Sequence, residues 1–222
     1  MNRRIAFLLV AGAMLAGCVS TRTAQVADAK AAEWRGKSVV LTQRPATDFI
    51  ATTAGKAAFA LVGVVAMLEA GKKIVQENNI EDPAPRLARD LLAFAQTQFG
   101  VTPAATSPVQ AGSTTVDPAK LVQGAAGADL VFDIQGMGGQ FRYLPMHWNL
   151  YVVDSGYKFR ILEVAGAKVV AEGFCIRQGD SKKAIPKDEL LANQAARLKE
   201  ILDTQRQECF EELKQKVFGI RP

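Results

Sequence analysis

The sequence predicts an α+β fold, in which helices lie mainly on one face of an antiparallel-containing sheet of four or five strands. Three alternating apolar and polar segments within residues 147–177 are separated only by short turn-like sequences, which predicts a C-terminal three-strand meander. Residues 188–217 carry apolar side chains at helical spacing and predict a long C-terminal helix. Strand and helix patterns alternate only partly along the chain, and this favours the α+β class.

The first half of the expected domain holds one strand, an apolar run, one amphipathic helix and a loop. Pro45 ends the strand and Gly100 closes the helix, because proline cannot donate to a ladder and glycine suits the position after a helix. In chain order the expected elements are a strand at 37–42, an apolar run at 57–68, an amphipathic helix at 86–99, a loop at 101–118 with room for one short strand, and a short helix from Asp117 to Ala126.

The second half carries the clearest strand patterns. A glycine-rich connection at 136–145 is expected to follow the first of them. Ser155-Gly156 and Gly166-Ala167 are expected to form the two turns of the meander. The expected strands are 129–135, 147–154, 157–165 and 168–177.

Cys175 and Cys209 form an even pair once the N-terminal Cys18 is set aside. Cys175 shares a small-residue strand face with Gly173, and Cys209 lies on the apolar stripe of the long helix. These two surfaces are expected to meet, so we predict a disulfide between them in an oxidising compartment. Two separate buried thiols are the alternative.

The N-terminus has the pattern of a secretory signal. Arg3 and Arg4 precede an apolar stretch, Ile5 to Ala16, that is too short to span about 30 Å of hydrocarbon. The stretch ends in Leu15-Ala16-Gly17-Cys18, which resembles the lipobox of bacterial lipoproteins.

That resemblance implies cleavage before Cys18, so residues 1–17 would be the signal peptide and Cys18 the lipidated N-terminus carrying diacylglycerol and palmitate. Two or three acyl chains give stable anchoring. Val19 follows the cysteine, and in this class of lipoprotein a residue other than aspartate at that position points to the outer membrane. Residues 18–36 are then expected to be the lipidated cysteine and a tether, and 37–222 a single domain facing the periplasm.

A second resemblance concerns the folded part. A helix, then Gly127-Ala128-Asp129-Leu130-Val131-Phe132, then a meander resembles envelope lipoprotein domains of the curli-secretion and penicillin-binding-protein-activator type. The N-terminal domain of the Tol-system propeller protein is similar in layout. The resemblance covers roughly residues 37–177, and the chain departs from it at 57–68 and 101–118. It supports the fold and implies no function.

Composition narrows the classes of function. The chain has 222 residues, 49% of them apolar and 22% charged, which suits one globular domain with a core. The formal charge is +5, and no basic stripe is interleaved with aromatic residues, so no nucleic-acid partner is expected.

No motif for catalysis, a cofactor or a metal stands out. Gly55-Lys56 lacks the earlier glycine and the following Ser or Thr of a phosphate loop, since Ile50 and Ala57 occupy those places. His147 is the single histidine and has no companion for a metal site. We therefore expect a non-enzymatic protein without a cofactor.

Two segments are candidate partner contacts. Gly55, Gly63 and Gly71 recur every eight residues near one helical face, with Phe59 and Met67 between them. Such a face suits a buried core helix, docking on a partner or second copy, or insertion into a membrane surface. The second candidate is the 136–146 loop, beside which Phe141, Arg142, Tyr143 and Met146 cluster.

These patterns predict a periplasmic interaction or adaptor module in envelope assembly or transport, with an envelope protein or a second copy as partner. A self-assembling or membrane-inserting component of a secretion or transport complex is the first alternative. A peptidoglycan-binding lipoprotein is the second.

Overall fold

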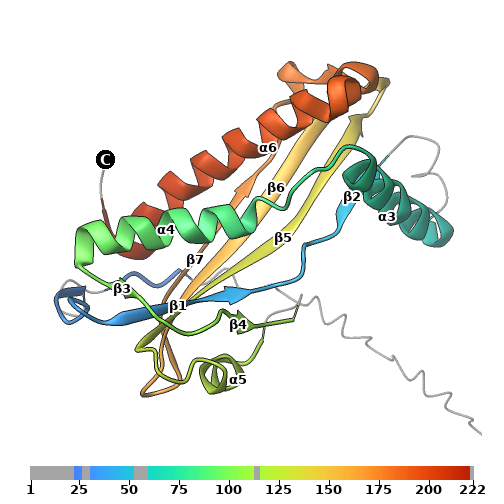
Figure 1. The fold of residues 1–222 in the computed structure, drawn as a ribbon. Helices are drawn as coiled ribbons and strands as arrows, with labels where there is room; N and C mark the ends of the chain where they lie inside the picture. The colour runs from blue at the N-terminus through green and yellow to red at the C-terminus, as the bar shows by residue number, and fades with distance from the viewer. Residues whose placement is uncertain (1–22, 27–30, 53–59, 113–115, 221–222) are drawn as a thin grey trace, which may run out of the picture.

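The computed structural model describes residues 23–26, 31–52, 60–112 and 116–220 (Figure 1). Its helices are α3 (Ala60–Glu77), α4 (Ala84–Phe99), α5 (Pro118–Gln123) and α6 (Lys187–Phe218), with a 3-10 turn η1 (Ser181–Lys183). Its strands are β1 (Ser38–Gln43), β2 (Phe49–Thr52), β3 (Thr102–Pro103), β4 (Val109–Gln110), β5 (Leu130–Leu144), β6 (His147–Glu163), β7 (Lys168–Arg177) and β8 (Ile185–Pro186).

The strands form one mixed sheet of eight. Five of them follow the order β3-β1-β5-β6-β7, while β2, β4 and β8 pair with β5, β1 and β6 beside this path. Strands β5, β6 and β7 are antiparallel neighbours, whereas β1 and β2 run parallel to β5. The predicted α+β class and the long C-terminal helix are therefore confirmed.

The antiparallel meander consists of β5, β6 and β7, so the predicted make-up from 147–154, 157–165 and 168–177 is wrong, because the first two of these segments form the single strand β6. Residues 136–144 belong to β5, and Ser155-Gly156 lies inside β6, so the expected glycine-rich loop and the turn at Ser155-Gly156 are both wrong. The glycines form an irregularity in the ladder between Gly136 and Gly139, and Gly138 has a φ of 95°. Ser155 is in ladder register with Gly139 and Arg177, and its hydroxyl donates to Gln205 of α6.

Helices α4 and α6 lie on one face of the sheet and bury the main core (Figure 1). Phe132 and Phe159 of the sheet meet Phe218 of α6 in this core. On the opposite face, Val131 and Leu162 pack against α5 and the chain that leads to it. Helices thus lie mainly on one face, as predicted, with the short α5 on the other.

Three local features differ from the expected elements. Strand β2 was not predicted, and the expected loop at 101–118 holds two short strands where one was foreseen. Within α6, residues Ala192 to Ala195 leave helical geometry, with three consecutive residues at positive φ. The continuous part of the C-terminal helix therefore begins after Ala195.

The predicted cysteine pair is joined. Cys175 of β7 and Cys209 of α6 form a disulfide with their Cα atoms 5.5 Å apart. Gly173, on the same strand face, lets the helix approach, because a Cβ there would meet Val217 at 2.7 Å.

The folded domain begins before Lys37, where the tether was expected to end. Trp34 is fully buried against Phe99 and Phe218. Ala24 also pairs with Glu172 of β7. Part of the expected tether at 18–36 is therefore packed onto the domain, because an indole buried in the core holds the chain that precedes the first strand.

Candidate interaction surface

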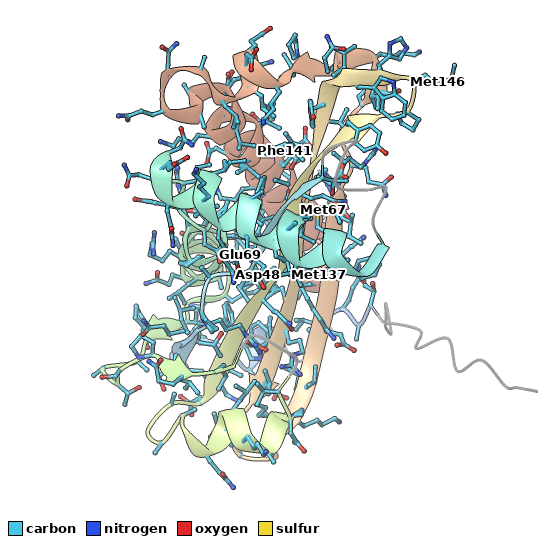
Figure 2. The ribbon with its side chains drawn as sticks, turned by 90° about the vertical axis from the view of Figure 1, so that its right-hand side faces the viewer. Asp48, Met67, Glu69, Met137, Phe141 and Met146 are labelled. Carbon is cyan, nitrogen blue, oxygen red and sulfur yellow. A yellow bond between two sulfur atoms is a disulfide. The ribbon has the colours of Figure 1, made fainter. Side chains whose placement is uncertain are left out.

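The turn between β5 and β6 presents an apolar tip, which we define as residues 143–148 (Figure 2). Met146 is 85% exposed and Trp148 is 59% exposed. The rings of Tyr143 and Trp148 lie 5.3 Å apart between centroids, with planes 35° from parallel. The tip therefore offers two aromatic rings and a flexible thioether side chain, residue types that are enriched at protein interfaces.

The sequence builds this tip through its turn residues. Pro145 fixes its own φ, and Met146 follows at a φ of 67°. A proline followed by a residue of positive φ is the pattern of a tight turn in which glycine is usually preferred. Met146 therefore occupies a position that favours glycine, and its side chain points away from the domain (Figure 2).

The base of the tip is fixed to the core. Phe141 is fully buried, with its ring 5.9 Å from that of Phe49 and 5.2 Å from that of Tyr151. Burial raises the pKa of Tyr151, and the neighbouring phenol of Tyr143 adds to the effect. The base of the hairpin is therefore a buried aromatic cluster, and its turn carries exposed apolar side chains.

The predicted contact residues of this segment therefore divide. Phe141 faces the core, so its side chain does not reach the surface, and that part of the predicted contact is wrong. Arg142 lies on the other face of the strand, where its Nε donates to Asp154 at 2.8 Å. Tyr143 is half-buried and belongs to the tip, as the neighbour of Trp148.

Helix α3 crosses beside β2 and carries the other predicted contacts (Figure 2). Gly55 and Phe59 lie outside the described residues. Gly63 and Gly71 are buried, and Met67 is half-buried. The side chains of Val64 and Val65 are 48% and 62% exposed, so this helix has an outward apolar surface that does not include its glycines.

Gly71 is required for the contact between α3 and β2. An added Cβ would lie 1.6 Å from the carbonyl oxygen of Phe49. We expect Gly71→Ala to lower the free energy of unfolding by about 3 kcal/mol or more, since the helix must move off the strand. Chemical denaturation measures this. Gly112→Ala is the matched control, because nothing lies within 4 Å of its added Cβ, and equal stability losses in the two variants would contradict the assignment.

A cavity of about 380 Å³ lies where the edge of β5 changes partner. Strand β1 pairs with β5 at Leu130–Phe132 and β2 pairs with it at Gly139–Arg142, which leaves a gap between the two strands. Apolar groups of β1, β5 and α4, among them Leu41, Ala88 and Ile134, line this cavity.

A buried ion cluster fixes the opposite face of the sheet. Asp133 is 1% exposed and accepts from Arg44 Nε at 2.7 Å and from Arg160 Nη2 at 2.6 Å. The two arginines also donate to the carbonyl oxygens of Gly112 and Val116. Burial by itself would raise the pKa of Asp133, but the two guanidinium groups outweigh it and hold that pKa below its ordinary value.

The geometry of this ion cluster indicates a structural role. Each carboxylate oxygen of Asp133 is used, and Thr42 donates to the same carboxylate at 2.9 Å. The arginines join the sheet to the chain that leads into α5. Within the described ranges, no group of three His, Cys, Asp or Glu side chains is arranged to hold a metal ion. No helix in that part of the chain is long and apolar enough to cross a membrane.

Sequence reasoning missed Trp148 as part of the exposed surface. It falls in an alternating run, where a strand pattern alone does not tell which face is covered. Pro145 was the available signal, because a proline between two strand-like runs marks a turn whose flanking side chains are exposed.

Comparison with known proteins gives structural similarity only. No family model and no curated protein sequence matches the chain. Similar solved structures include the lipoprotein GNA1162 from Neisseria meningitidis, at 16% identity and a TM-score of 0.28, covering 78% of this chain and 99% of that one. The PelC dodecamer from Paraburkholderia phytofirmans is 13% identical with a TM-score of 0.36, covering 89% and 96%.

The C-terminal domain of LpoB from Escherichia coli is 14% identical with a TM-score of 0.22, covering 65% of this chain and 84% of that domain. At these TM-scores and identities the similarities assign the chain to no family and transfer no function to it.

Proposed function

We propose that the chain is a non-enzymatic lipoprotein of the bacterial outer membrane, facing the periplasm, that binds another envelope protein. The lipobox at Leu15-Ala16-Gly17-Cys18 supports the anchor, although it lies outside the described residues. The disulfide between Cys175 and Cys209 agrees with an oxidising compartment. The apolar tip at 143–148 is the observation that supports a protein partner.

The tip suits a partner contact for two reasons. It is exposed at the end of a hairpin whose base is packed in the core, so its backbone can enter a pocket with little loss of conformational freedom. Its aromatic side chains are the type that contribute most binding energy when they are fully desolvated. Anchoring would concentrate the tip near other envelope proteins, so that even a weak contact gains from effective concentration.

The anchor is tested by the intact mass of the chain purified from membranes. The proposal requires a mass that lacks residues 1–17 and carries a diacylglyceryl group on Cys18. Cys18→Ala is expected to leave the signal uncleaved and the thiol modification absent. A membrane-derived chain with a free Cys18 thiol would contradict the proposal.

The partner contact is tested by the size of the complex that mild detergent extracts from the native cells. We expect a complex larger than the monomer, and its loss in Met146→Gly combined with Trp148→Ser. Glycine suits the φ of 67° at position 146, so the turn survives while the apolar side chain is removed. A complex of unchanged size in this variant would contradict the role of the tip.

A self-assembling component is the second candidate, and the exposed Val64 and Val65 of α3 favour it. This candidate predicts that the purified chain forms an oligomer by itself and that Val64→Ser with Val65→Ser dissolves it. The adaptor predicts a purified monomer that these substitutions leave unchanged. Sedimentation of the purified chain separates the two.

A further inference from the structure

The N-terminal segment Thr23–Val26, which we call the strap, is attached to the domain as a short added strand. Ala24 donates its N–H to the carbonyl of Glu172 at 2.8 Å and accepts from the Glu172 N–H at 2.9 Å. These two bonds place the strap on the outer edge of β7, opposite the edge that pairs with β6. A sheet edge is a general site for adding a strand.

Two further contacts fix the strap to the end of α6. Val26 donates its N–H to the carbonyl of Val217 at 2.8 Å, and its side chain is buried at 5% exposure. The Gln25 side-chain amide donates to the carbonyl of Gln215 at 3.0 Å. The chain is therefore held at a defined place on the domain, well before the buried Trp34.

The position of the strap limits the length of chain between the anchor and the domain. Cys18 precedes Ala24 by six residues, so a fully extended chain spans at most about 21 Å between them. Beyond the strap, Ala31 is the next of the described residues that packs against the core. The corresponding span from Cys18 would then be about 45 Å.

The strap lies far from the apolar tip along the sheet. Glu172, which bonds to Ala24, also pairs with Arg160 of β6. From Arg160 to His147, beside the tip, β6 continues for a length of roughly 40 Å at the usual rise per residue. The strap therefore ties the anchor to a part of the sheet that is far from the tip.

We propose that the strap is a reach-setting device: closed, it holds the β7 end of the domain within about 21 Å of the anchoring membrane, and released, it lets the domain move roughly twice as far away. This rests on the proposed lipidation of Cys18. Among the described residues, the strap is held by one bridge, two further hydrogen bonds and one buried side chain, so it opens more easily than the core does. Its state determines how far into the periplasm the tip extends.

The test compares two proline variants of the full lipidated chain. Ala24→Pro removes the N–H that bonds to Glu172, whereas Thr23→Pro is the matched control, since Thr23 donates to no other described residue. Hydrogen exchange at the Glu172 amide reports the strap directly. We expect this exchange to be slow in the unsubstituted chain and in Thr23→Pro, and at least tenfold faster in Ala24→Pro.

Height above the membrane is measured in vesicles of phosphatidylethanolamine and phosphatidylglycerol that carry an acceptor dye on the lipid head groups. A donor replaces the exposed Lys168, on the strand that bears the strap. We expect energy transfer to fall clearly when Ala24→Pro is combined with Val26→Pro, which also removes the N–H that bonds to Val217, and to stay at the unsubstituted level in Thr23→Pro. Equal transfer in all three chains, or fast Glu172 exchange in the unsubstituted chain, would overturn the strap.

The two proposals fail in different ways. If the chain carries no lipid on Cys18 and does not bind the vesicles, the proposed anchoring is wrong, and the exchange measurement still decides whether the strap exists. If the chain is lipidated and bound but the prolines at positions 24 and 26 change neither readout, the anchor stands and the strap is overturned.

Discussion

Asp133→Ala is expected to lower the free energy of unfolding by about 3–5 kcal/mol, because it leaves Arg44 and Arg160 charged, buried and without their carboxylate. That is a large share of the roughly 5–15 kcal/mol that holds a typical domain together. Because the two arginines also donate to the carbonyls of Gly112 and Val116, the segment leading to α5 should lose its order first. Chemical denaturation gives the loss, and hydrogen exchange locates it.

The control lies four residues earlier on the chain. Asp129 accepts from the Ser38 backbone and hydroxyl but is exposed, so Asp129→Ala is expected to lower stability by only about 1 kcal/mol. If the two alanine variants lost the same stability, the buried cluster would not have the role assigned to it. Replacing all three charged residues of the cluster by apolar side chains should restore much of the loss.

The pH dependence of this effect has a definite sign. The pKa of Asp133 in the folded chain is held below its ordinary value, so its contribution is fully present above the ordinary carboxyl pKa of about 3.9. The contribution is lost as the pH falls through the folded-state pKa. The stability gap between the unsubstituted chain and Asp133→Ala should therefore stay constant from neutral pH down to about 4 and close only in stronger acid.

Reduction of the disulfide is expected to lower the free energy of unfolding by about 4 kcal/mol. Cys175 and Cys209 are 34 residues apart, and the chain-entropy model gives this value for a loop of that length. For a chain of this size the loss corresponds to a fall in melting temperature of roughly 10 °C. Thermal melts with and without reductant measure it.

The control for reduction is the double variant Cys175→Ala with Cys209→Ala. It should melt at the lower temperature whether or not reductant is present. A melting temperature of the unsubstituted chain that does not respond to reductant, with reduction verified by thiol counting, would contradict a stabilising role for the bridge.

Elements with a strong local pattern were predictable from the sequence. The helix at 86–99 and the strand at 168–177 follow from periodicity, and the disulfide follows from two cysteines on surfaces that pack together. The glycines of β5 misled the prediction because their cause lies elsewhere in the fold. A Cβ at Gly136 would meet Thr47 at 2.8 Å, and one at Gly139 would meet the Phe49 ring at 2.9 Å. These glycines mark a close approach of the chain around β2, which local sequence does not reveal.

The candidate surface was predictable only in part for the same reason. Tyr143 was singled out by its aromatic neighbours, but Phe141, two residues earlier, faces the core because of its contacts with Phe49 and Tyr151. Strand β2 was not foreseen, so nothing in the sequence indicated what would cover Phe141. The exposure of Met146 follows from a two-residue turn, and the exposure of α3 depends on where β2 places it.

The central claim is that the tip at 143–148 is the surface that meets a partner, and site-specific photo-crosslinking in living cells tests it most directly. Probes replace Met146 at the tip and, as a control, Lys168 at the opposite end of the sheet. The account predicts one recurrent envelope protein crosslinked from position 146 and absent from position 168. Crosslinks from position 146 only to the chain itself or to lipid would contradict it.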